Sequence, residues 1–299
     1  MKKNYMKRFV LRLGAVAVLI AVACVCAASA VVTGDVATDD ETCNLGDDAR
    51  SVHEFESLVE KARWGDRQAF LRLAECYRDG FGTERHFGAM TLMVEMATLY
   101  GAIDNERVFF DAIPQDCEYK TFIDILNMGA GVREVSDSVM RLLTLVGGND
   151  AMAVRGIVMA ECGDTVQGMS LIRQAVDEGS DVADIIWLVS CSGRRDEMPD
   201  ATVLLKMAER FPGVYSLLAV MCLEPDDDGN IDEPRAADYC LKAERRAMLG
   251  NRQKRWLLSY NEKKGNALLT DEDVRRIETS LLRAEVGAGD DATDDADAE

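Results

Sequence analysis

The chain has 299 residues, of which 53 are acidic and 34 are basic, and its formal net charge at pH 7 is −19. This excess of negative charge argues against nucleic acid as a partner, because the phosphates would be repelled. No stretch alternates apolar and polar residues of β-branched type for long enough to indicate a sheet, so we expect an all-α fold.

The amino terminus has the pattern of an export signal. Basic residues precede an uncharged run from Leu13 to Val32, and Ala28, Ser29 and Ala30 follow the motif of a signal-peptidase site. The run of about 20 residues is also long enough to span a bilayer. We therefore expect residues 1–30 to be a signal peptide cleaved after Ala30, or else a membrane anchor. The basic residues are Lys2, Lys3, Lys7, Arg8 and Arg12.

Both alternatives place the rest of the chain beyond the cytoplasmic membrane of a bacterial cell, in the periplasm or envelope. Membrane contact would then occur only through the amino-terminal segment, with residues 13–32 as the anchor if they are retained. Lipidation at Cys24 is a third possibility, disfavoured by Ala21, which stands where such signals usually carry leucine. Residues 31–52 are expected to form a linker.

Residues 62–101 carry the clearest structural pattern in the chain. Apolar residues four positions apart predict one face of a helix, two glycines then end it, and small residues two turns apart mark a second helix. Small residues at these spacings allow two helices to pack closely. The residues concerned are Ala69, Leu73 and Tyr77 on the first helix, Gly80 and Gly82 in the turn, and Ala89 and Ala97 on the second helix.

This segment resembles the Sel-one-like repeat, a relative of the tetratricopeptide repeat, whose pattern is A-x-x-G-x-x-x-A-x-x-x-L-G-x-x-Y-x-x-G-x-G. Ala74 and Thr83 depart from the family's usual glycine and valine. The resemblance implies an α-solenoid of stacked antiparallel helix hairpins, with a concave surface that binds a protein or peptide. The matching residues are Ala62, Gly65, Ala69, Leu73, Tyr77, Gly80 and Gly82.

Weaker copies follow at intervals of roughly 34 residues, the tetratricopeptide period. Their glycine anchors are Gly147, Gly179, Gly213 and Gly250. We expect hairpins over 148–179, 179–213 and 213–249, and one or two degenerate copies before Gly147.

The last expected pair covers 251–265 and 271–285, where Thr270 and Asp273 form a variant capping box. The repeats would thus fill residues 53–286. Residues 287–299 form an acidic tail with nothing to bury, which is typical of a disordered extension.

The chemistry-bearing residues are few. His53 and His86 belong to no metal-ligand or nucleophile pattern, so we expect no metal, cofactor or catalytic residues. The acidic run from Glu224 resembles a calcium loop, but Arg235 occupies the position that requires a bidentate glutamate. Cys222 and Cys240 lie on opposite helices of one expected hairpin and could form a disulfide, although sequence cannot place them within bonding distance.

One segment is locally basic and could dock an acidic partner, although charge runs are more often ordinary solvated faces. Its candidate docking residues are Arg245, Arg246, Arg252, Lys254 and Arg255.

Two functions remain open. The first is an exported, non-catalytic scaffold that binds a protein or peptide in the cell envelope, as the resemblance implies. The alternative is an envelope hydrolase whose paired carboxylates come from separate repeats and so escape a motif search. A deep apolar cleft that holds such a pair would favour the hydrolase.

Overall fold

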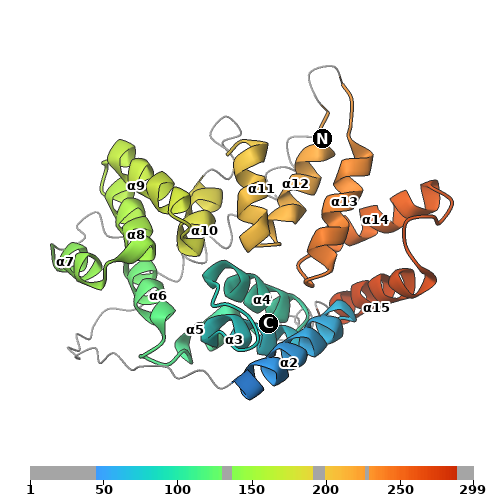
Figure 1. Cartoon of the computed structure of the whole chain (residues 1–299), viewed down its shortest axis with the longest axis horizontal. Helices are drawn as coiled ribbons and strands as arrows, with labels where there is room; N and C mark the ends of the chain where they lie inside the picture. The colour runs from blue at the N-terminus through green and yellow to red at the C-terminus, as the bar shows by residue number, and fades with distance from the viewer. Residues whose placement is uncertain (1–44, 130–136, 191–198, 226–228, 288–299) are drawn as a thin grey trace, which may run out of the picture. The chain divides into compact units, whose positions relative to one another are not determined.

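The computed structural model describes residues 45–129, 137–190, 199–225 and 229–287 (Figure 1). Within these ranges the chain forms helices joined by turns and loops, and no strand is present. The prediction of an all-α fold is therefore confirmed.

The chain divides into two compact units. The middle unit, Ile113–Pro199, contains α6 (Glu118–Gly129), α7 (Asp137–Val146), α8 (Gly148–Glu161), α9 (Thr165–Asp177) and α10 (Asp181–Ser190). The composite unit combines Ala49–Ala112 with the chain from Asp200 onward. Its helices are α2 (Leu45–Arg63, from Ala49), α3 (Arg67–Asp79), α4 (Phe87–Leu99), α5 (Glu106–Asp111), α11 (Ala201–Arg210), α12 (Val214–Cys222), α13 (Glu233–Glu244), α14 (Asn251–Lys263) and α15 (Asp271–Gly287).

The hairpin predicted from residues 62–101 is present as α3 and α4. Asp66 caps the start of α3 by accepting a hydrogen bond from the backbone N–H of Gln68, and Gly80 ends the helix in the left-handed conformation. The alanine, leucine and tyrosine positions of the repeat pattern all lie in the core, where their small or apolar side chains bring the helices together. They are Ala62, Ala69, Leu73, Tyr77, Ala89 and Ala97, none more than 6% exposed.

Gly82 is the point at which this hairpin approaches α2 most tightly. Its φ of +67° is in the left-handed region, and a Cβ at this position would overlap the backbone carbonyl of Ser51 in α2. Gly80 has a similar φ of +74°, but a Cβ there would meet only the flexible side chain of Arg85, at 3.2 Å. The two glycines are thus required for different reasons, and only Gly82 is also required for packing.

His86 begins α4 and is a buried histidine cap. Its Nδ1 accepts a hydrogen bond from the backbone N–H of Ala89 at 3.1 Å, and its ring lies against Phe211 with the ring centres 5.1 Å apart. Burial and the nearby positive charge of Arg210 lower its pKa to about 4. The imidazole is therefore neutral at physiological pH.

The middle unit is built around a close crossing of α8 and α9. Gly156 and Gly168 face each other, and a Cβ at Gly156 would lie 2.7 Å from the carbonyl oxygen of Gly168. Gly163, with φ +105°, forms the tight turn between the two helices. The hairpin predicted over 148–179 is therefore present, and two facing glycines determine how closely its helices pack.

The next two predicted copies have different outcomes. Residues 213–249 form the hairpin of α12 and α13, and Pro234 lies in the first turn of α13, where its missing N–H is tolerated. Residues 179–213 are divided between the units, because α10 packs on α8 and α9 whereas α11 packs on α12. The unit boundary therefore falls inside a predicted repeat.

The composite unit brings the first hairpin against the last helix, α15. The hydroxyls of Tyr100 and Ser280 are 2.8 Å apart, and Arg283 donates a hydrogen bond to the backbone carbonyl of Trp64 at 2.6 Å. These contacts join residues about 180 and 220 positions apart. In a linear stack each repeat contacts only its neighbours, so a continuous solenoid is not confirmed.

The capping box predicted before α15 is confirmed. The Thr270 hydroxyl accepts a hydrogen bond from the Asp273 N–H at 3.1 Å, and Asp273 accepts one from the Thr270 N–H at 3.2 Å. The last residues of the predicted linker 31–52 are helical, because α2 already begins at Leu45, and the rest of that segment lies outside the described residues. The predicted export segment 1–30 and the predicted acidic tail, apart from Gly287, lie outside the described residues. Among the described helices none is long and apolar enough to cross a membrane.

Substituting the two turn glycines by alanine tests the packing at Gly82. Because both substitutions carry the strain of a positive φ, their difference isolates the overlap with α2. We expect Gly82→Ala to lower the free energy of unfolding by about 1–3 kcal/mol more than Gly80→Ala does. Urea unfolding followed by circular dichroism measures both, and equal losses would show that α2 yields to the added methyl group.

The His86 cap predicts a pH-dependent stability. Because the folded pKa of about 4 is below the ordinary value of 6.5, the unfolded chain binds the proton more readily. The stabilisation is complete above about pH 6.5, and up to about 3 kcal/mol is lost as pH falls to about 4. His86→Asn retains a capping acceptor without this titration. Urea unfolding of both proteins between pH 6.5 and pH 4 should show that the free energy of unfolding falls more steeply for the native chain than for His86→Asn. Parallel curves would contradict the lowered pKa of His86.

Candidate functional site

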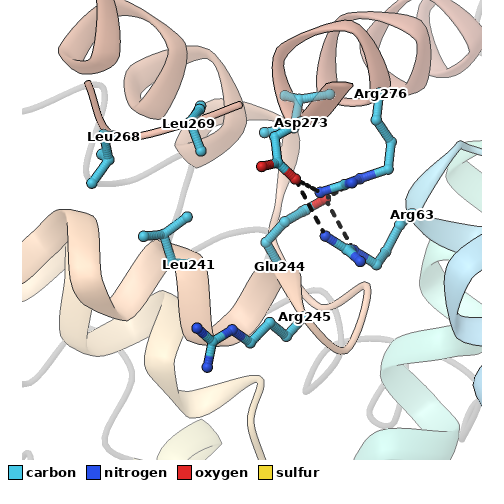
Figure 2. A pocket seen from close by; sticks show the side chains of 9 residues that line it. Arg63, Leu241, Glu244, Arg245, Leu268, Leu269, Asp273 and Arg276 are labelled. Atoms are coloured by element: carbon cyan, nitrogen blue, oxygen red, sulfur yellow. Dashed lines mark hydrogen bonds and ion pairs between the residues drawn. The ribbon is translucent and has the colours of Figure 1, made fainter. Parts of the chain in front are cut away.

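The composite unit contains a cavity of about 220 Å³ where α2, α13 and α15 meet (Figure 2). Charged side chains form one part of its wall and aliphatic side chains form the other. The charged residues are Arg63, Glu244, Arg245, Asp273 and Arg276, and the aliphatic residues are Leu241, Leu268, Leu269 and Ile277.

Glu244 is the central charge of this site. It ends α13 with only 2% of its surface exposed, and the Nε atoms of Arg63 and Arg276 each lie 3.9 Å from its Oε1. These distances are ion pairs but too long for hydrogen bonds. Neither carboxylate oxygen has a hydrogen-bond partner among the described residues, and the same holds for the two arginine Nε atoms.

Burial raises the pKa of Glu244, and three cations oppose that rise. Loss of solvation is the larger effect, and Lys254, Arg63 and Arg276 act in the opposite direction. Lys254 is itself only 1% exposed, and its ammonium donates a hydrogen bond to the Ser280 hydroxyl at 2.7 Å. A buried carboxylate surrounded by three cations thus connects α2, α13, α14 and α15.

Asp273 is the second carboxylate of the site, and its environment is different. Partial burial raises its pKa, but hydrogen bonds from Thr270 and Arg276 outweigh this effect and the pKa is lowered. Arg276 donates from Nη2 to Oδ1 at 2.5 Å, and Arg63 Nη2 lies 3.8 Å from the same oxygen. Asp273 therefore stays ionised and holds the two arginines beside Glu244, as Figure 2 shows.

Arg245 differs from the other arginines of the site. Its side chain is exposed and extends toward Leu241, apart from the group of Arg63, Glu244, Asp273 and Arg276 (Figure 2). Within the described part of the chain it forms no ion pair. The three arginines and Lys254 outnumber the two carboxylates, so the site is cationic within a strongly acidic protein.

The positions of Glu244 and Arg276 along their helices indicate that both are buried, although the motifs of the sequence did not point to them. Glu244 follows Ala237 and Cys240 at spacings of three and four, so it continues the buried face of α13. Arg276 likewise lies four positions before the buried Ser280 on the buried side of α15. A charged residue in register with a buried helical face is the feature that indicates such a site.

One of the predicted basic docking residues is buried, and the others have different surroundings. Lys254 is buried and belongs to the charge network, so it is not available for docking. Arg255 forms an exposed ion pair with Glu285, and Arg246 lies over the ring of Phe55. Arg245 lines the cavity, and Arg252 is exposed at the start of α14.

The remaining candidate residues are the two histidines and the pair Cys222 and Cys240. His53 is exposed, and His86 caps a helix. Cys222 and Cys240 are free thiols, and burial raises the pKa of Cys240 to about 12. In the described ranges no group of three or more His, Cys, Asp or Glu side chains could hold a metal ion. The acidic run after Glu224 lies partly outside these ranges.

Comparison of the chain with protein-family models, curated proteins and solved structures finds no match of any kind. The resemblance to the Sel-one-like repeat therefore rests on the residues of this sequence alone.

Replacing Glu244 by glutamine tests whether the buried carboxylate is ionised. At pH 7 we expect Glu244→Gln to lower the free energy of unfolding by about 3–5 kcal/mol, because Arg63, Arg276 and Lys254 would lose their shared anion. The matched change Glu285→Gln affects an exposed pair and should cost at most about 1 kcal/mol. If both variants unfold at the same urea concentration as the native chain, Glu244 is neutral in the folded state.

Proposed function

We propose that this chain is an exported, non-catalytic helical scaffold that binds a segment of a protein or peptide in the cell envelope. The observation that carries the proposal is the cavity of the composite unit. It combines an aliphatic wall with a cationic edge, and together these provide both affinity and orientation for a polar chain with an apolar side chain.

The surrounding fold supports this role. The walls of the cavity come from α2, α13, α15 and the loop before α15, and its charged residues are fixed by contacts between these helices. A site with groups positioned in advance binds with less loss of side-chain entropy. Export itself is supported by the basic and apolar pattern of the first thirty residues.

A hydrolase is the second candidate, because one observation favours it. Glu244 and Asp273 come from α13 and α15, line one cavity, and have pKa values shifted in opposite directions. Such divergence is typical of an acid and base pair. However, Asp273 accepts hydrogen bonds from Thr270 and Arg276, and guanidinium groups flank both carboxylates. These contacts favour a binding site over proton transfer.

Capture of partners from an envelope extract tests the proposal when two leucine variants are compared. Leu268 is 37% exposed and lines the cavity, whereas Leu282 is 63% exposed on α15 and is not part of the lining. We expect the native chain and Leu282→Glu to retain one specific protein that Leu268→Glu loses, because the new carboxylate opposes the charge selectivity of the site. Mass spectrometry identifies the protein.

The same comparison can contradict the proposal. If a captured protein is retained equally by both variants, the cavity is not its binding site. If nothing is captured by a chain that is folded by circular dichroism, the scaffold role fails. Release of products from envelope glycans or peptides, abolished in a folded Glu244→Gln variant, would instead establish the hydrolase.

A further inference from the structure

The middle unit holds a group of carboxylates where α6, α8 and α10 meet. Glu118 comes from α6, Asp150 from α8 and Asp181 from α10. We propose that this junction is a proton-sensitive clasp, which is tight when Asp150 carries a proton and loosens when all three carboxylates are ionised. The clasp belongs to the middle unit and shares no residue with the cavity.

Asp150 fixes the beginning of α10 from a neighbouring helix. It accepts a hydrogen bond from the Ser180 hydroxyl at 2.5 Å, and the backbone N–H of Val182 also donates to it. Ser180 in turn caps α10, because its hydroxyl oxygen accepts a hydrogen bond from the backbone N–H of Ala183 at 2.9 Å. A change in the charge of Asp150 therefore acts directly on the first turn of α10.

Tyr119 joins the first and last helices of the middle unit. Its side chain is buried, and its hydroxyl donates a hydrogen bond to Asp181 at 3.3 Å. Burial and the nearby carboxylates raise the pKa of Tyr119, so the phenol keeps its proton and remains a donor. Because α6 opens the unit and α10 closes it among the described helices, this contact ties together the parts by which the chain enters and leaves the unit.

The charges that act most on Asp150 are of one sign. Burial raises the pKa of Asp150, and the carboxylates of Asp181 and Glu118 raise it further, whereas its two hydrogen bonds act in the opposite direction. The helices α7 and α9 also pack on α8, but these leading charges come from α6 and α10. Asp184, one turn further along α10, is fully buried and is not among them.

The raised pKa of Asp150 determines the direction of the response. Because it lies above the ordinary value of 3.8, the folded chain binds this proton more readily than the unfolded chain does. The stabilisation is complete below about pH 3.8 and is lost as pH rises through the folded pKa. The His86 cap of the composite unit responds in the opposite direction, because its pKa is lowered.

Hydrogen exchange of the full chain, followed by mass spectrometry, measures both units in one experiment. Between pH 4 and pH 7 we expect the protection of the α10 amides, corrected for the intrinsic exchange rate, to fall as pH rises. Release of one proton allows a fall of up to about tenfold per pH unit. Protection of the α3/α4 hairpin should rise over the same range, because the His86 cap is stabilising only when the imidazole is neutral.

Three variants test whether Asp150 is the titrating group. Asp150→Asn keeps an acceptor for Ser180 but cannot titrate, so α10 should keep constant protection across the range. Asp181→Asn removes one repelling charge and should make the fall shallower, whereas Asp177→Asn, which changes an exposed carboxylate on α9, should behave as the native chain does.

Two results would overturn the proposal. The first is constant protection of α10 in the native chain, or a fall that Asp150→Asn reproduces. The second is a fall that α3 and α4 share, because the whole chain would then be losing stability as pH rises. If Asp150→Asn does not fold, an unchanged slope in Asp181→Asn would contradict the clasp equally.

Discussion

The composite unit depends on a carboxylate that it buries. Glu244 is almost inaccessible to solvent, and the cations around it come from α2, α14 and α15. An isolated buried charge costs several kcal/mol, so these helices can form one unit only while Arg63, Arg276 and Lys254 stay beside the carboxylate. Arg63, Glu244 and Arg276 also form part of the cavity wall.

The small residues of the chain have a different role from these charges, because they control the distance between helices. Gly82 against α2, and Gly156 against Gly168, determine how closely two backbones approach, and packing of this kind is sensitive to a single methyl group. The charges determine which helices meet, whereas the glycines determine how closely they meet. In the composite unit, Gly82 and the charged residue Arg63 both belong to residues 62–101, the segment that resembles a Sel-one-like repeat.

Much of the local structure could be predicted from sequence, because it depends on neighbours in the chain. Helix period, the turn glycines and the Thr270 capping box are read within a few residues. The cavity could not be predicted in this way, since Arg63 and Glu244 are separated by 181 positions and their meeting depends on tertiary packing. The burial of Lys254 could not be predicted from its neighbours in the chain either. Its place among basic residues suggested an exposed side chain, but its position on the helix places it in the interior.

The contact between Tyr100 and Ser280 has a consequence for how the chain folds. A ribosome releases the α3/α4 hairpin long before α15, and the residues that form the middle unit are synthesised in between. Until then the surface that α15 covers stays open. Because this contact joins residues 180 positions apart, we expect it to form last and to leave this surface exposed to association with other chains meanwhile.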